Sequence, residues 1–131
     1  MYDPLAGAAM KIMTAMPFPA VFEYPCSVPG GPVVTYGLYA VLVHSGPTLT
    51  RGHYYSFARP SGCAHLRLHD CACHPWARFD DRDVTPASFG SMAQFLSRSE
   101  AASAYMLFYR RLDDTACKAL LVLPCLCADW D

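Results

Sequence analysis

The longest stretch of strand-forming residues in the chain is Val33–His44, with the sequence VVTYGLYAVLVH. Its β-branched and aromatic side chains favour a β-strand, and turn residues at 31–32 (GP) and 45–47 (SGP) bound it on both sides. Almost every position is apolar, rather than every second one. We therefore expect a strand whose two faces are both covered.

Shorter patterns of the same kind follow. Strand-forming residues flanked by turns predict three further strands, at 53–59 (HYYSFAR), 76–81 (WARFDD) and 103–111 (SAYMLFYRR). The segment 60–75 has turn signals at both ends, which predicts a strand, a long turn and a returning strand. In the first 32 residues, six prolines exclude a long helix and favour short extended pieces such as Ala20–Tyr24.

One helix is predicted, from Pro86 to about Leu96. Thr85 can cap its first turn, and proline suits the first helical position. Apolar residues then recur at i, i+3, i+4 and i+7, at Phe89, Met92, Ala93 and Leu96.

The composition is more apolar than a small domain needs. Of the 131 residues, which suit one domain, 53% are hydrophobic and 16% charged, whereas soluble domains carry about 25% charged residues. We expect an apolar face that meets a partner or a missing part of the same protein. The net charge of −1 predicts neither a nucleic-acid nor a membrane partner. Seven cysteines without paired spacing predict reduced thiols and a cytoplasmic or nuclear location.

A histidine and an acid stand at positions that a hairpin would bring together. If the strands at 53–59 and 76–81 pair antiparallel, His53 at the start of the first lies beside Asp80 at the end of the second. A carboxylate on one imidazole nitrogen leaves the other nitrogen to act as a base. Asp81 should then face the opposite side of the sheet. An ordinary half-buried histidine and a solvated acidic turn would fit the same spacing.

The surrounding residues resemble a known family. The stretches YGLYAVLVHSG, GHYYSFAR, WARFDDRDVTP and AYMLFYRR, in this order over residues 36–111, resemble the C-terminal histidine box of the ubiquitin-specific proteases, which are papain-like cysteine deubiquitinases. A weaker likeness covers residues 2–24, and none follows Arg111. The resemblance implies an α+β fold, the C-terminal part of a papain-like protease, mainly antiparallel sheet with one packed helix. Residues 1–111 would form this part and 112–131 a C-terminal extension.

The resemblance also implies roles for the pair. His53 matches the general base that deprotonates the catalytic thiol. Asp80 matches the acid that orients this histidine, with Asp81 as a supporting or substitute acid.

Substrate contacts are implied for three further residues. Gly52 and Tyr54 would line the channel for the C-terminal tail of ubiquitin, beside a mobile loop at 45–52. A side chain at Gly52 would obstruct the narrow end of that channel. His44 is a further candidate, although packing within its strand would explain it equally.

The family's nucleophile, a cysteine in an Asn-Thr-Cys segment at the start of a helix, has no match in the 131 residues. Cys26 precedes His53 but lies among prolines with no helix after it, so we do not expect it to be the nucleophile.

We expect a deubiquitinase-family chain that acts on ubiquitin or a ubiquitinated protein, without a cofactor or metal. Alone it should be inactive, since it needs the missing N-terminal half of the catalytic domain as a partner. The alternative is a non-catalytic ubiquitin-binding or scaffold module.

Two segments depart from the family. Cysteines and histidines crowd into residues 63–74 (CAHLRLHDCACH), and such ligands suit zinc, although the spacing is not that of paired zinc motifs. A zinc-stabilised interaction module and a chance insertion both remain open. The tail from Leu112 has no assignable pattern.

Overall fold

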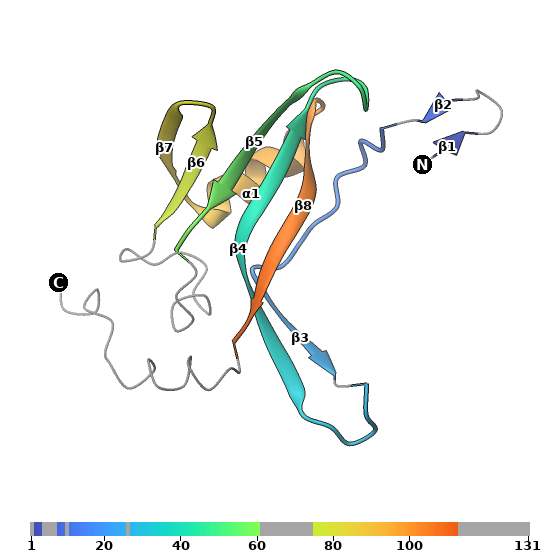
Figure 1. The fold of residues 1–131 in the computed structure, drawn as a ribbon, viewed down its shortest axis with the longest axis vertical. Coiled ribbons are helices and arrows are strands. Elements are labelled where there is room, and N and C mark those ends of the chain that lie inside the picture. Colours follow the sequence, from blue (N-terminus) through green and yellow to red (C-terminus); the bar gives the residue numbers. More distant parts are fainter. Residues whose placement is uncertain (1, 4–7, 10, 26, 61–74, 113–131) are drawn as a thin grey trace.

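A computed structural model describes residues 2–3, 8–9, 11–25, 27–60 and 75–112. Most of these residues form a six-stranded antiparallel sheet with one helix against one of its faces (Figure 1). The predicted class, a mainly antiparallel sheet with one packed helix, is confirmed. Within this described part, the helix falls short of the length and apolarity that a bilayer crossing requires.

The sheet is organised around β4 (Val33–Ser45), the long strand that the sequence predicts. Its neighbours are β3 (Val21–Pro25), β5 (His53–Ala58) and β8 (Ala102–Arg111), all antiparallel to it. Every residue of β4 except Val33 is buried or half-buried, which agrees with its almost continuous apolar sequence.

The sheet continues from β5 to β6 (Trp76–Asp80) and then to β7 (Asp83–Ala87). β5 and β6 are the antiparallel pair on which the predicted site depends. A separate two-stranded piece, β1 (Tyr2–Asp3) with β2 (Ala8–Ala9), has no counterpart among the predicted elements.

The helix α1 (Phe89–Arg98) begins three residues later than predicted. Ser88, not Thr85, is its cap: the Ser88 hydroxyl accepts from the Ser91 backbone N–H at 3.0 Å, and the Ser91 hydroxyl accepts from the Ser88 N–H at 3.2 Å. Thr85 and Pro86 instead belong to β7, where they pair with β6. The predicted helix start was wrong because an outer strand tolerates proline as well as a first helical turn does.

The core lies between the sheet and α1. Trp76, Leu38 and Met92 are at most 1% exposed. The helix contributes Met92 and Leu96 to this core, and both are among the apolar positions that predicted the helix. Leu112, which we assigned to the extension, is 2% exposed and donates its N–H to the Thr35 carbonyl at 2.8 Å, so the packed part of the chain includes it.

The face of the sheet away from α1 exposes large apolar side chains. Six of them, between 37% and 60% exposed, lie there: Tyr54, Phe79, Val84, Tyr105, Met106 and Phe108. Cross-strand pairs such as Phe79 with Val84 place these residues on one surface, and the Tyr54 and Tyr105 rings touch at 5.7 Å between centroids. This surface, which we call the outer face, is the apolar surface that the composition predicts.

Candidate active site

The register of β5 and β6 brings His53 and Asp80 to the same face of the sheet. Ser56 pairs with Phe79 and Phe57 with Arg78. One further step along this register puts Asp80 opposite Tyr55, and His53 is then its diagonal neighbour on that face. The face is the one that packs on α1, and the site lies at its edge, where the His53 side chain is 49% exposed and that of Asp80 25%.

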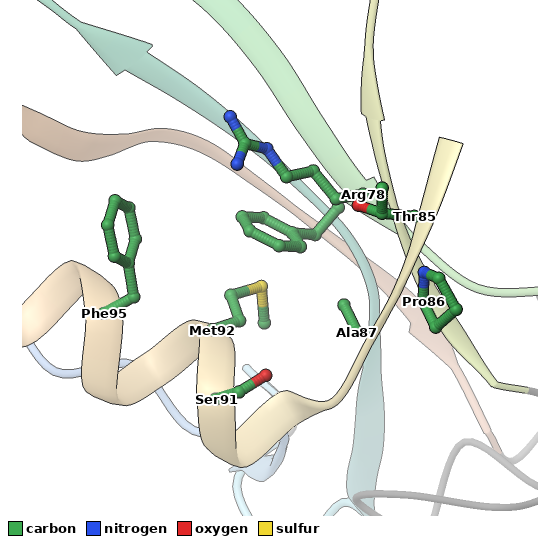
Figure 2. Close-up of a pocket in the computed structure, with 8 residues that line it drawn as sticks. Arg78, Thr85, Pro86, Ala87, Ser91, Met92 and Phe95 are labelled. Atoms are coloured by element: carbon green, nitrogen blue, oxygen red, sulfur yellow. The ribbon is translucent and has the colours of Figure 1, made fainter. Parts of the chain in front are cut away.

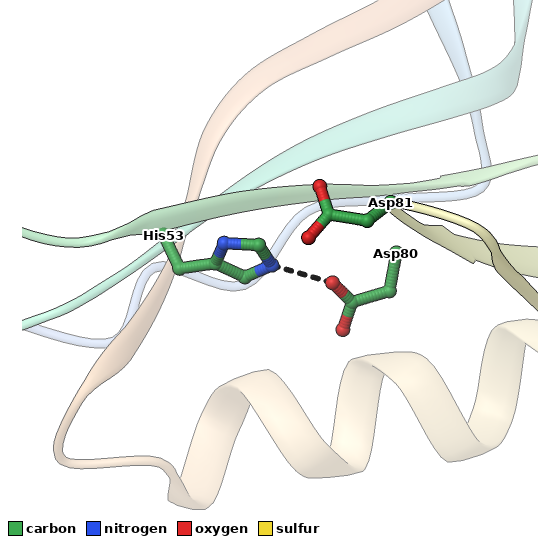
Figure 3. A group of neighbouring side chains, drawn as sticks. All are labelled: His53, Asp80 and Asp81. Carbon is green, nitrogen blue, oxygen red and sulfur yellow. Dashed lines mark hydrogen bonds and ion pairs between the residues drawn. The ribbon is translucent and has the colours of Figure 1, made fainter.

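His53 and Asp80 are in direct contact. The His53 Nε2 and Asp80 Oδ1 atoms lie 2.5 Å apart (Figure 3). An ionised carboxylate has no proton to donate, so Nε2 carries the shared proton and donates it. In the neutral ring, Nδ1 then holds the lone pair, and it makes no hydrogen bond to any described residue. The structure therefore places these two residues side by side, as predicted, and leaves Nδ1 without a hydrogen bond to the described residues.

Arg78 holds the second oxygen of the same carboxylate, and the sequence reasoning did not identify it. Its guanidinium donates to Asp80 Oδ2 at 2.5 Å and lies over the Tyr55 ring, 4.2 Å from the centroid. Period-2 alternation places Arg78 on the same face as Asp80, two residues away. The strand alternation of the predicted hairpin could therefore have identified Arg78 as a neighbour of Asp80.

The electrostatics of the pair follow from these contacts. The hydrogen bond with Asp80 is the main reason that the pKa of His53 lies above its ordinary value of 6.5. Desolvation by burial lowers this pKa, the charges of Asp80 and Asp81 raise it further, and Arg78 lowers it slightly. The hydrogen bond with His53, assisted by Arg78, lowers the pKa of Asp80. The contact thus favours a protonated imidazole beside an ionised carboxylate.

Asp81 does not face away from His53, which corrects our expectation. Its φ of +52° is in the left-handed region, at the turn between β6 and β7. Strand alternation therefore ends at Asp80, and the Asp81 carboxylate turns back toward the ring (Figure 3). One donor atom from each of His53, Asp80 and Asp81 lies within 4.8 Å of the other two.

A histidine with two carboxylates also has the donor types of a divalent-metal site. Here, however, the Asp80 oxygens are already engaged by His53 and Arg78. This arrangement favours acid–base chemistry at these side chains.

Two of the predicted substrate contacts, Tyr54 in β5 and His44 in β4, form a cross-strand pair on the opposite face of the sheet from His53. Tyr54 is 48% exposed, and its ring lies 4.7 Å from that of His44. His44 is 4% exposed, and burial followed by the charge of Lys11 lowers its pKa. That position supports strand packing for His44, the explanation left open beside substrate contact.

Gly52 is required by a close approach inside the protein. A Cβ there would collide with the buried His44 ring and lie 2.6 Å from the Ser45 carbonyl oxygen. Gly46 faces the same limit, since its φ is +149° and a Cβ would lie 2.6 Å from the Arg51 carbonyl oxygen. The two glycines let the loop between β4 and β5 close tightly beside His53.

Lys11 ties this loop to the start of β8, a role that the apolar pattern could not show. Its ammonium donates to the Gly46 carbonyl at 2.7 Å and to the Ala101 carbonyl at 3.0 Å. The cluster at 63–74, Cys26 and the tail from residue 113 lie outside the described residues.

Comparison with known proteins identifies the family. The sequence model described as ubiquitin carboxyl-terminal hydrolase matches residues 7–109. Human ubiquitin carboxyl-terminal hydrolase 35 is 33% identical over 106 residues, which cover 77% of this chain and 10% of that protein. The probable ubiquitin carboxyl-terminal hydrolase 9 of Schizosaccharomyces pombe is 34% identical over 80 residues, covering 60% of this chain and 12% of that protein.

Solved structures agree on the fold. A chain of the SAGA DUB module of Ubp8, Sgf11, Sus1 and Sgf73, bound to monoubiquitin, superposes with a TM-score of 0.61 at 24% identity, over 83% of this chain and 21% of that chain. Another structure of the SAGA DUB module gives a TM-score of 0.56 at 26% identity, over 80% and 20% of the two chains. The chain thus spans between a tenth and about a fifth of the proteins that it matches. It belongs to the ubiquitin carboxyl-terminal hydrolase family, as part of a catalytic domain of the ubiquitin-specific protease type.

Proposed function

We propose that His53 and Asp80 are the general base and the orienting acid of a thiol hydrolase that cleaves the bond after the terminal glycine of ubiquitin. The observation that carries the proposal is the 2.5 Å contact between His53 Nε2 and Asp80 Oδ1, which leaves Nδ1 open. Family membership supplies the reaction class.

The chemistry follows from the two nitrogens. Nδ1 takes the proton of a cysteine thiol, and the thiolate attacks the carbonyl carbon of the scissile bond. The imidazolium that forms is stabilised by the Asp80 carboxylate and then gives its proton to the leaving amine. Water, deprotonated by the same nitrogen, releases the acyl group and restores the thiol. The thiol comes from a segment outside the 131 residues, and a second polypeptide or a longer form of this protein would supply it.

The surroundings of the pair support further roles within this proposal. Asp81 strengthens the negative field on the ring, and Tyr54 with Gly52 lines the approach of the ubiquitin tail at the same strand end. The reducing compartment implied by seven cysteines, cytoplasm or nucleus, suits a thiol enzyme.

A chimera tests the proposal directly. The segment of human ubiquitin carboxyl-terminal hydrolase 35 that aligns with this chain is replaced by residues 7–112, and release of a fluorophore from the C-terminus of ubiquitin is measured. We expect turnover, a loss of about 10²–10⁴-fold in kcat with His53→Ala, and a smaller loss with Asp80→Asn. Gln94→Ala, on the exposed side of α1, is the control and should keep the activity.

The second candidate is a non-catalytic ubiquitin-binding module, and the exposed outer face favours it. A folded chimera that binds ubiquitin but hydrolyses nothing would support this alternative against the enzyme. Equal activity of the His53→Ala and parent chimeras would contradict the assignment of the base.

A further inference from the structure

We propose that Arg78 is a positioning residue: its guanidinium, seated on the Tyr55 ring, holds the Asp80 carboxylate in line with His53. This proposal deepens the proposed function, on which its catalytic meaning rests, and it assigns a role to a residue outside the His–Asp pair.

The contacts of Arg78 form a chain from the core to the imidazole. Tyr55 is 6% exposed and belongs to the core, so its ring is a fixed surface. The guanidinium lies 4.2 Å from the centroid of that ring and donates to Asp80 Oδ2 at 2.5 Å. The other oxygen of the same carboxylate meets His53. Each oxygen of Asp80 therefore has its own donor, which fixes the rotation of the carboxylate about its Cβ–Cγ bond.

Packing alone does not hold the guanidinium. A pocket of about 270 Å³ lies between β5, β6, β7 and α1, and Arg78 lines it together with Phe95 and Met92 (Figure 2). The Arg78 side chain is 41% exposed, so it has room to leave its place. Its position thus depends on the ring face and on Asp80.

The contact with Asp80 also stabilises the Arg78 guanidinium. Its Nε is buried without a hydrogen-bond partner among the described residues. The cation is thus partly desolvated, and the ionised carboxylate at its outer end compensates it. Lysine could supply the charge, but it lacks the flat group that lies on the ring.

Replacing Arg78 by a neutral residue should change the pKa of His53 in opposite directions, depending on whether Arg78 positions Asp80 or acts only as a charge. This difference makes the proposal testable. Among the residues that the structure describes, the charged groups that act on the His53 ring are Asp80, Asp81 and Arg78. The hydrogen bond that His53 donates to Asp80 is the largest influence on the pKa of His53, and the repulsion from Arg78 is the smallest. If Arg78 acts only as a charge, its removal raises the pKa of His53. If Arg78 holds Asp80 in place, its removal loosens the hydrogen bond and the pKa falls.

The experiment is an NMR titration of the histidine rings in the full chain, labelled with ¹⁵N. The chain has five histidines, and the His53 signal is assigned from its loss in His53→Gln. We expect Arg78→Gln to lower the pKa of His53 by at least half as much as Asp80→Asn does. Arg78→Lys should restore only part of the difference. Arg82→Gln, a neighbouring exposed cation that does not act on the ring, is the matched control and should leave the pKa unchanged.

A second pair of variants tests the ring under the guanidinium. Tyr55→Phe keeps the ring and should leave the pKa of His53 unchanged, whereas Tyr55→Leu removes the ring and should lower it with Arg78 still present. Urea unfolding confirms that each variant is folded at the titration temperature.

An unchanged or raised pKa in Arg78→Gln overturns the proposal, and equal pKa values in Tyr55→Leu and Tyr55→Phe remove the ring from it. The titration needs no catalytic activity. Its failure is therefore distinct from a failure of the proposed function, which the His53→Ala chimera reports.

Discussion

Replacing Gly52 by alanine should both destabilise the fold and disturb His53. A Cβ at this position collides with the His44 ring and lies 2.6 Å from the Ser45 carbonyl oxygen. The ring cannot swing aside easily because His44 is 4% exposed. The carbonyl belongs to the backbone of β4, so relief requires the two strands to separate.

The size of the effect can be worked from these contacts. Side chains essentially never approach a heavy atom closer than 3.0 Å through Cβ, so the gap must open by at least 0.4 Å, from 2.6 Å to 3.0 Å. Ser45 pairs with His53, and the displacement therefore falls on the residue that contacts Asp80. Overpacking of this kind costs about 1–3 kcal/mol of the free energy of unfolding. The pKa of His53 should also fall toward its ordinary value as its contact with Asp80 lengthens.

The assay is urea unfolding followed by circular dichroism, with an NMR titration of His53 on the same samples. Gly90→Ala is the control, because a Cβ at Gly90 meets nothing within 4 Å and the residue lies inside α1. It should raise the free energy of unfolding by about 0.5–1 kcal/mol through helix propensity. If Gly52→Ala were as stable as the parent chain and left the pKa of His53 unchanged, the close approach that we describe would be refuted.

Three further outcomes are expected, each measurable by urea unfolding. Ser88→Ala should lower the free energy of unfolding by about 0.5–2 kcal/mol, as loss of a helix cap does. Thr85→Ala should change it by less than about 0.5 kcal/mol. A larger loss in Thr85→Ala than in Ser88→Ala would show that Thr85 is the cap. Trp76→Ala should cost about 3–5 kcal/mol because the side chain is 1% exposed, and a loss below 1 kcal/mol would contradict its place in the core. The stability gap between the parent chain and Asp80→Asn should be widest between the ordinary pKa values of the two groups, 3.8 for the carboxyl and 6.5 for the imidazole. Folding favours the protonated imidazole and the ionised carboxylate, so the gap shrinks as pH rises through the folded pKa of His53 or falls through that of Asp80; a gap independent of pH would exclude the ion pair.

The sheet and the central contact of the site could be predicted because they depend on local patterns. Turn residues and strand-forming runs located β4, β5, β6 and β8, and antiparallel pairing then required His53 and Asp80 to be neighbours. The apolar excess likewise predicted an exposed apolar face. Each of these inferences needs only the period of a strand and the direction of its neighbour.

The failures have equally physical causes. Asp81 was misplaced because a left-handed residue at the turn ends the alternation of β6, and nothing in the letters DDRD marks which acid takes that conformation. The predicted helix start falls within β7 because Thr85 and Pro86 suit both an edge strand and a first helical turn. Lys11 lies far from the loop in sequence, and only the folded chain brings its ammonium to the Gly46 carbonyl.

The most direct test of the pairing of His53 with Asp80 is the protonation state of the two ring nitrogens of His53, measured from their ¹⁵N chemical shifts across a pH titration of the full chain. We expect the neutral ring to carry its proton on Nε2, with Nδ1 unprotonated, and the pKa of His53 to lie above 6.5. In Asp80→Asn, that pKa should fall. A neutral ring protonated on Nδ1, or a pKa at or below 6.5 that Asp80→Asn leaves unchanged, would contradict the assignment of His53 and Asp80 as base and orienting acid.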